Sequence, residues 1–114
     1  MDDLLKKKVS HLTEDKKLLD QSSVNIYLQS LAGWSLQKID EEQALYKSFK
    51  LKDFSSSVEF AQKICDIANS NDHHPRLIVN WGKLEVYWWS HDMGGINTND
   101  VIMAAQTENI YNKK

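Results

Sequence analysis

The stretch "PRLIVNWGKLEVYWWSH", residues 75–91, decides the fold. Two runs rich in β-branched and aromatic residues flank Gly82, and this pattern predicts two antiparallel strands joined by a tight turn. Pro75 precedes the first run and biases His74 toward extended backbone, so a helix upstream must end before it. The stretch therefore predicts a helix that is followed at once by a β-hairpin.

The residues before the proline have the spacing of an amphipathic helix. Asp53 or Ser55 can cap its start, and apolar residues recur at intervals of three and four. These apolar positions are Phe54, Val58, Ala61, Ile64, Cys65 and Ala68. Cys65 belongs to the series and lies neither at a helix start nor in a basic setting. We therefore expect it to be a small buried side chain rather than a nucleophile.

The rest of the chain predicts a second hairpin and two more helices. Their expected positions are 13–33 for a helix that Thr13 caps and that "DQSS" (20–23) could interrupt, 34–39 and 44–51 for strands, and 97–111 for a last helix. The resulting order, α-β-β-α-β-β-α, is typical of an α+β fold. It predicts a four-stranded antiparallel sheet with three helices packed on one face.

Length and composition fit one globular domain over residues 1–114, with residues 1–11 as a flexible N-terminal extension. The formal net charge of -2 provides no basic surface for nucleic acid, and no segment approaches membrane-spanning length. A single cysteine excludes an internal disulfide and fits a reducing compartment. We therefore expect a cytoplasmic protein that binds neither nucleic acid nor membrane.

Three histidines are the residues best suited to chemistry. His73 and His74 precede the first strand of the predicted hairpin, and His91 ends the second. Because the start of one antiparallel strand lies beside the end of its partner, His91 returns to the neighbourhood of the double histidine. Imidazoles exchange protons near neutral pH, and Trp89 lies on the same strand face as His91. The pattern favours a planar, hydrogen-bonding ligand.

Other interpretations of these residues stay open at this point. The double histidine could be an ordinary polar loop, and three histidines with a carboxylate could bind zinc or iron. Asp100 falls at the third position of the last helix if Asn97 is its N-cap, where a carboxylate stabilises the helix start without any catalytic role. The tryptophans could belong to the core or to a subunit contact.

At these residues the chain resembles the pterin-4a-carbinolamine dehydratase family. The family signature is His-His-Pro, an aromatic residue a few positions on, a histidine ending the next strand, and an aspartate opening the last helix. Here the signature reads His73-His74-Pro75, Trp81, His91 and Asp100. The resemblance extends over residues 12–110 and includes "AGW" before the first strand and "SHDMGG" after the last one.

The resemblance implies a function and a set of site residues. Family members convert 4a-hydroxytetrahydropterin to quinonoid dihydropterin and water, which supports tetrahydrobiopterin recycling. They use no metal and no cofactor, and they form homodimers or homotetramers through sheet edges. The implied catalytic residues are His73, His74 and His91, with His73 and His91 as the proton-transfer pair. The implied substrate contacts are Asp100, Trp81, Pro75, Ser90 and Trp89. Some members act instead, or in addition, as dimerisation partners or coactivators of transcription factors.

Two departures from the family pattern flank the double histidine. Many members carry an acidic residue where this chain has Asn69, and a tryptophan where it has Leu77. The first departure removes a carboxylate partner, and the second makes one wall of the site less aromatic. For subunit pairing we expect an exposed outer strand at 44–51 or at 83–90.

Overall fold

The computed structural model describes residues 1–113, and Lys114, which belongs to the predicted domain, lies outside the described residues. The order of the main elements is that predicted, with a short helix and a 3-10 turn added at the N-terminus. The helices are α1 (Asp2–Leu5), α2 (Gln21–Gln29), α3 (Phe54–Asn71) and α4 (Thr98–Asn112), and the 3-10 turn is Thr13–Asp15. The strands are β1 (Ser35–Ile39), β2 (Glu42–Lys50), β3 (Arg76–Asn80) and β4 (Lys83–Trp88).

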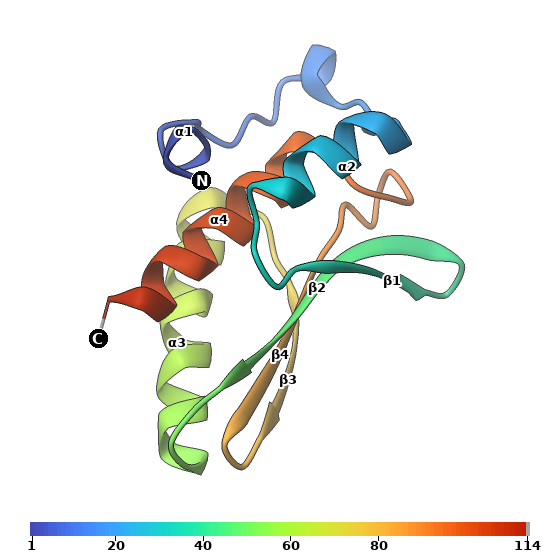
Figure 1. Ribbon diagram of the computed structural model, residues 1–114. Coiled ribbons are helices and arrows are strands. Elements are labelled where there is room, and N and C mark those ends of the chain that lie inside the picture. Colours follow the sequence, from blue (N-terminus) through green and yellow to red (C-terminus); the bar gives the residue numbers. More distant parts are fainter. Residues whose placement is uncertain (114) are drawn as a thin grey trace.

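The four strands form one antiparallel sheet in the order β1-β2-β4-β3, with helices on one side of it (Figure 1). The α+β fold class is therefore confirmed. Both predicted hairpins are present, and Gly82 takes a positive φ of 70° in the β3–β4 turn, which glycine adopts without strain. Asp40 and Glu41 also have positive φ and form the tight β1–β2 turn, as two-residue hairpin connections require.

The sheet order corrects the expected outer strand. We predicted that 44–51 or 83–90 would lie at the edge, but β2 and β4 pair with each other at the centre. Their helix-facing residues explain this position, because Leu45, Phe49, Leu84, Val86 and Trp88 are each at most 1% exposed. Strands with so much apolar surface are stabilised by neighbours on both sides. The edges are β1 and β3.

The core lies between the sheet and the helices α3 and α4. Helix α3 buries Phe60, Ile64 and Ala68 against it. Cys65 follows Ile64 by one residue, which turns it about 100° around the helix, and it is exposed. The prediction of a buried thiol is therefore wrong, because two apolar stripes share this helix and only one of them faces the sheet.

The N-terminal quarter differs from the single helix expected to start at Thr13. Asp20 accepts a hydrogen bond from the backbone N–H of Ser23 at 2.8 Å, and this cap begins α2 only at Gln21. Before it the chain crosses the start of α4 in a largely extended path. Residues 1–11 include the buried Leu4, which packs into the core; whether this segment is flexible stays a prediction. Within residues 1–113, no helix is long and apolar enough to span a bilayer.

Candidate active site

A cavity of about 430 Å³ lies where the end of α3, the end of β4 and the start of α4 meet. All four histidines of the chain line it, and they are His11, His73, His74 and His91. Three of these were predicted to converge. The hairpin brings His91 back to the double histidine, as the antiparallel geometry requires.

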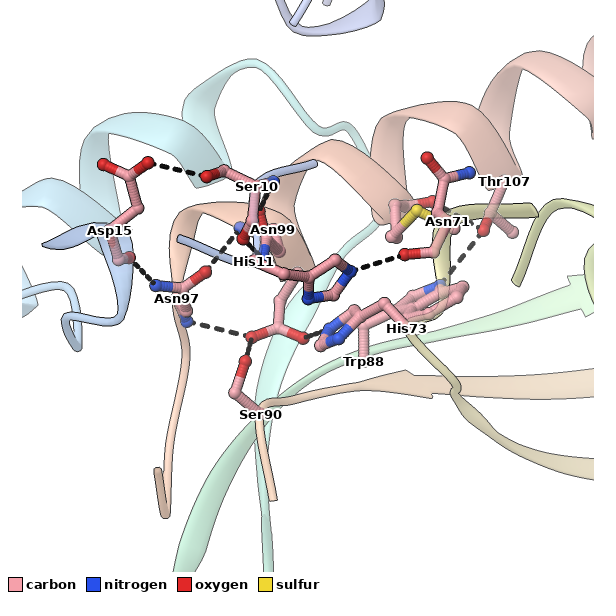
Figure 2. A network of polar contacts seen from close by, with 12 residues as sticks. Ser10, His11, Asp15, Asn71, His73, Trp88, Ser90, Asn97, Asn99 and Thr107 are labelled. Atoms are coloured by element: carbon pink, nitrogen blue, oxygen red, sulfur yellow. Dashed lines mark hydrogen bonds and ion pairs between the residues drawn. The ribbon is translucent and has the colours of Figure 1, made fainter. Parts of the chain in front are cut away.

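Contacts of both its backbone and its ring hold His73 in one orientation. Asp72 ends α3 in the left-handed conformation (φ 47°, ψ 46°), and the N–H of His73 then donates to the carbonyl of Ala68 at 3.1 Å. The ring stacks on that of Trp88, with centroids 5.7 Å apart and planes 13° from parallel. Its Nε2 lies 2.5 Å from Oδ1 of Asp100 (Figure 2). The side chain is 13% exposed, so only a small part of the ring faces the cavity.

Asp100 serves the helix and the histidine with the same carboxylate. Its Oδ2 accepts hydrogen bonds from the backbone N–H of Asn97 at 2.9 Å and from the hydroxyl of Ser90 at 2.7 Å. Asn97 is the N-cap of α4 and Asp100 its third residue, so the predicted capping role is confirmed. The carboxylate is fully buried, and Oδ1 remains for His73.

The pairing of His73 with Asp100 determines which ring atom is available for chemistry. An ionised carboxylate only accepts hydrogen bonds, so Nε2 of His73 is the donor. The atom that can exchange a proton with a ligand is therefore Nδ1.

His74 has a different partner. Its Nε2 lies 3.1 Å from the side-chain oxygen of Asn69 on the last turn of α3. This is the position at which the resemblance to the family pattern leads us to expect an acidic residue. The amide oxygen of Asn69 accepts the hydrogen bond as a carboxylate would, but it adds no charge. Asn69 can therefore orient the ring of His74 through this hydrogen bond.

His91 follows β4 in the turn that closes between Ser90 and Gly95. Its side chain is 83% exposed, and its Nδ1 lies 3.4 Å from Oε1 of Glu42 at the start of β2. The edge of the Trp89 ring meets its ring at an interplanar angle of 86°. His91 is therefore open to solvent, with a carboxylate close to one ring nitrogen.

The predicted substrate contacts do not all lie at the cavity. Trp89 and Ser90 line it, whereas Asp100 lies fully buried behind Ser90 and His73. Pro75 precedes β3 and is half-buried. Trp81 lies in the β3–β4 turn at the opposite end of the hairpin, where it is 72% exposed.

Two residues at the site were not found from the sequence. His11 lines the cavity and contacts the backbone of Asn71, sixty positions away. Glu42 approaches His91 from β2. Neither belongs to a local motif, so no signal in the sequence separates them from other polar residues. Within residues 1–113, no group of three or more His, Cys, Asp or Glu side chains is arranged to hold a metal ion.

The fold and the cavity define a class of protein: a small α+β protein whose antiparallel hairpin gathers imidazoles beside a buried carboxylate. Comparison with known proteins gives the family. Residues 17–110 match the family described as Pterin 4 alpha carbinolamine dehydratase. The chain belongs to this family.

Individual relatives are similar in sequence to this chain over most of its length. A Marinobacter nauticus protein assigned to the pterin-4-alpha-carbinolamine dehydratases is 33% identical over 97% of this chain and all of its own length. The mitochondrial pterin-4-alpha-carbinolamine dehydratase 2 of Arabidopsis thaliana is 35% identical over 96% of this chain and 62% of its own. The crystal structure of a transcriptional coactivator/pterin dehydratase from Brucella melitensis has a TM-score of 0.74 at 33% identity. That match covers 82% of this chain and 98% of the other.

Proposed function

We propose that the protein dehydrates 4a-hydroxytetrahydropterin to quinonoid dihydropterin by general acid–base catalysis with histidines. In this reaction the bond between C4a and the hydroxyl oxygen breaks, and the oxygen leaves as water after it receives a proton. The proton on N5 departs, and its electron pair completes the double bond between N5 and C4a. No oxidant or reductant takes part. The site must therefore supply one proton donor and one proton acceptor near neutral pH, which imidazole side chains can do.

The observation that supports this proposal most directly is the oriented ring of His73. Asp100 binds its Nε2, Trp88 fixes its plane, and Nδ1 remains to exchange a proton. A second imidazole, that of His91, lines the same cavity and is open to solvent. These two rings are the proposed proton-transfer pair.

The other cavity residues have proposed roles in binding. His74 is directed by Asn69, and we assign it to substrate orientation rather than to proton transfer. The Trp89 ring lines the cavity and provides a flat surface for a planar bicyclic ligand. Asp100 supports His73, so its proposed contact with the reaction is indirect.

The test of the proposed function is a dehydration assay with freshly generated 4a-hydroxytetrahydropterin, in which the absorbance of the quinonoid product is followed. We expect the purified protein to accelerate product formation over buffer. The same assay after treatment with a strong chelator, together with elemental analysis, tests metal dependence. We expect full activity after chelation. A stoichiometric metal whose removal abolishes activity contradicts the metal-free mechanism.

We also propose that the protein forms a homodimer or homotetramer. The sheet ends in β1 on one side and β3 on the other, and an edge strand offers unpaired backbone groups to a second copy. Strand β3 begins two residues after His74, so pairing along it places the second subunit near the site.

A second candidate function is binding of a transcription factor. It is favoured by the similarity to the Brucella melitensis protein, which is described as a transcriptional coactivator as well as a pterin dehydratase. The dehydration assay separates the two functions, because a protein that acts only as a binding partner leaves the uncatalysed rate unchanged.

A further inference from the structure

The N-terminal segment forms one wall of the cavity, and it lies before residue 17, where the family match begins. Its polar side chains at the cavity are Ser10, His11, Asp15 and Lys16. The segment crosses the start of α4, where Ser10 lies beside Asn99 and Asp15 beside Asn97 (Figure 2). The cavity is therefore bounded by a part of the chain that the signature motif does not include.

Two asparagines at the start of α4 hold this segment in place. Asn99 accepts a hydrogen bond from the N–H of Ser10 at 3.0 Å and donates one to its carbonyl at 2.8 Å. Asn97 donates to the carbonyls of Asp15 at 3.1 Å and Lys17 at 2.7 Å. Both asparagines are at most 8% exposed. Four hydrogen bonds, three donated and one accepted by these largely buried amides, fix the segment against the cavity.

His11 is the residue of this segment whose chemistry matches the site. Its Nε2 lies 2.8 Å from the backbone oxygen of Asn71, at the C-terminal end of α3. A carbonyl oxygen can only accept, so Nε2 carries the hydrogen and donates it. This hydrogen bond fixes the ring at the cavity that His73 also lines. Nδ1 makes no hydrogen bond within residues 1–113, so in the neutral ring it is an available acceptor.

A pterin presents several N–H groups along the edge of its rings, and an acceptor held at the wall of the cavity can bind one of them. We propose that His11 is a fourth histidine of the site and binds the substrate by accepting a hydrogen bond at Nδ1. The proposal rests on the proposed function. His11 positions the ligand and takes no part in the proton transfers assigned to His73 and His91.

The test compares His11→Ala and His11→Gln with the wild-type protein and with Leu12→Ala. Leu12 is the next residue, 60% exposed and not part of the cavity lining, so it is a matched control for the segment. Dehydration kinetics give KM and kcat, and quenching of pterin fluorescence gives the Kd of oxidised biopterin, a stable ligand that does not react. Thermal unfolding followed by circular dichroism verifies that each variant is folded.

For His11→Ala we expect KM and Kd to rise about five- to tenfold, the effect of one lost hydrogen bond, with kcat within about twofold of wild type. His11→Gln should recover much of the affinity, because its amide N–H can donate to Asn71 while its oxygen accepts from the ligand. Leu12→Ala should match the wild-type protein.

The possible outcomes separate this proposal from the proposed function. If wild-type protein binds biopterin and His11→Ala binds it equally well, the role of His11 is wrong while the dehydratase function stands. A fall in kcat at unchanged KM also contradicts a binding role. If the wild-type protein neither binds biopterin nor accelerates dehydration, both proposals fail together.

Discussion

A single buried carboxylate joins the start of α4 to the ring of His73. Asp100 accepts from Asn97 and Ser90 with one oxygen and contacts His73 with the other. From the sequence, a structural and a functional role for Asp100 were alternatives. The geometry combines the two roles in one carboxylate. The consequence is that the orientation of His73 depends on a helix cap that must form for α4 to fold. The site is thereby built on a rigid element rather than on a mobile loop.

If Asp100 acts through His73, replacing Asp100 should not lower the activity further in a protein that already lacks the His73 imidazole. We expect Asp100→Asn to lower kcat/KM by about 10- to 100-fold, because the amide does not fix the tautomer. The double variant Asp100→Asn/His73→Ala should be no less active than His73→Ala alone. Dehydration kinetics of all three proteins, each verified as folded by circular dichroism, provide the measurement.

Ser90→Ala is the matched control for this comparison. It removes one hydrogen bond to Oδ2 but keeps the charge and the contact with His73. Its activity should fall much less than that of Asp100→Asn. If the losses in kcat/KM caused by Asp100→Asn and by His73→Ala multiply fully in the double variant, the carboxylate does not act through the ring.

Helix α3 ends directly before the double histidine, and the cap at its start depends on pH. The backbone N–H of Ser56 donates to Asp53 at 2.8 Å. This hydrogen bond lowers the pKa of the Asp53 carboxyl below its ordinary value of 3.8, and the hydroxyl of Ser56 lowers it further. The cap is therefore strongest when Asp53 is ionised.

The sign of the effect follows from the lowered pKa. The unfolded chain takes up a proton at Asp53 near pH 3.8, and the folded protein does so only at lower pH. The cap's contribution to stability is present above pH 3.8 and is lost as the pH falls toward the lower value of the folded state. Asp53→Asn keeps a capping oxygen that cannot titrate, so we expect its free energy of unfolding to depend less steeply on pH between 5 and 2. Urea unfolding at several pH values tests this, and equal slopes for the two proteins contradict it.

Local patterns were sufficient to predict most elements and to bring three histidines together. Residues close in sequence determine three of the features predicted correctly. These are the end of α3 before Pro75, the β3–β4 turn at Gly82 and the cap of α4. The outer strand was predicted wrongly because the pairing of β2 with β4 joins segments far apart in the sequence, and apolar content alone does not show which strand becomes central. Cys65 was misplaced because helical periodicity alone does not show which of two apolar stripes faces the sheet. His11 and Glu42 reach the site only through tertiary contacts.

The unpaired edge of the sheet at β3 predicts that the protein self-associates. Ile78 lies in β3 opposite Glu85 of β4, on the face of the sheet that the helices leave open. A lysine at an edge strand opposes pairing with another chain. We therefore expect Ile78→Lys to shift the protein toward monomer in light scattering, without loss of the folded state.

Ser48→Lys is the control for the edge. Ser48 lies opposite Glu85 on the other side of β4, on the same open face but in the central strand β2. Its lysine adds the same charge without changing an edge, so the oligomeric state should stay that of the wild type. A wild-type protein that is monomeric at all concentrations, or an equal response to both substitutions, contradicts pairing through β3.

The ring of His73, oriented by Asp100 and Trp88, is the group proposed to transfer a proton during dehydration. The most direct measurement is the rate of quinonoid dihydropterin formation by His73→Ala relative to the wild-type protein, at equal concentrations of folded protein. We expect a loss of about 100-fold or more in kcat/KM, the effect typical of removing a general acid or base. A folded His73→Ala variant with activity within about twofold of wild type contradicts the account.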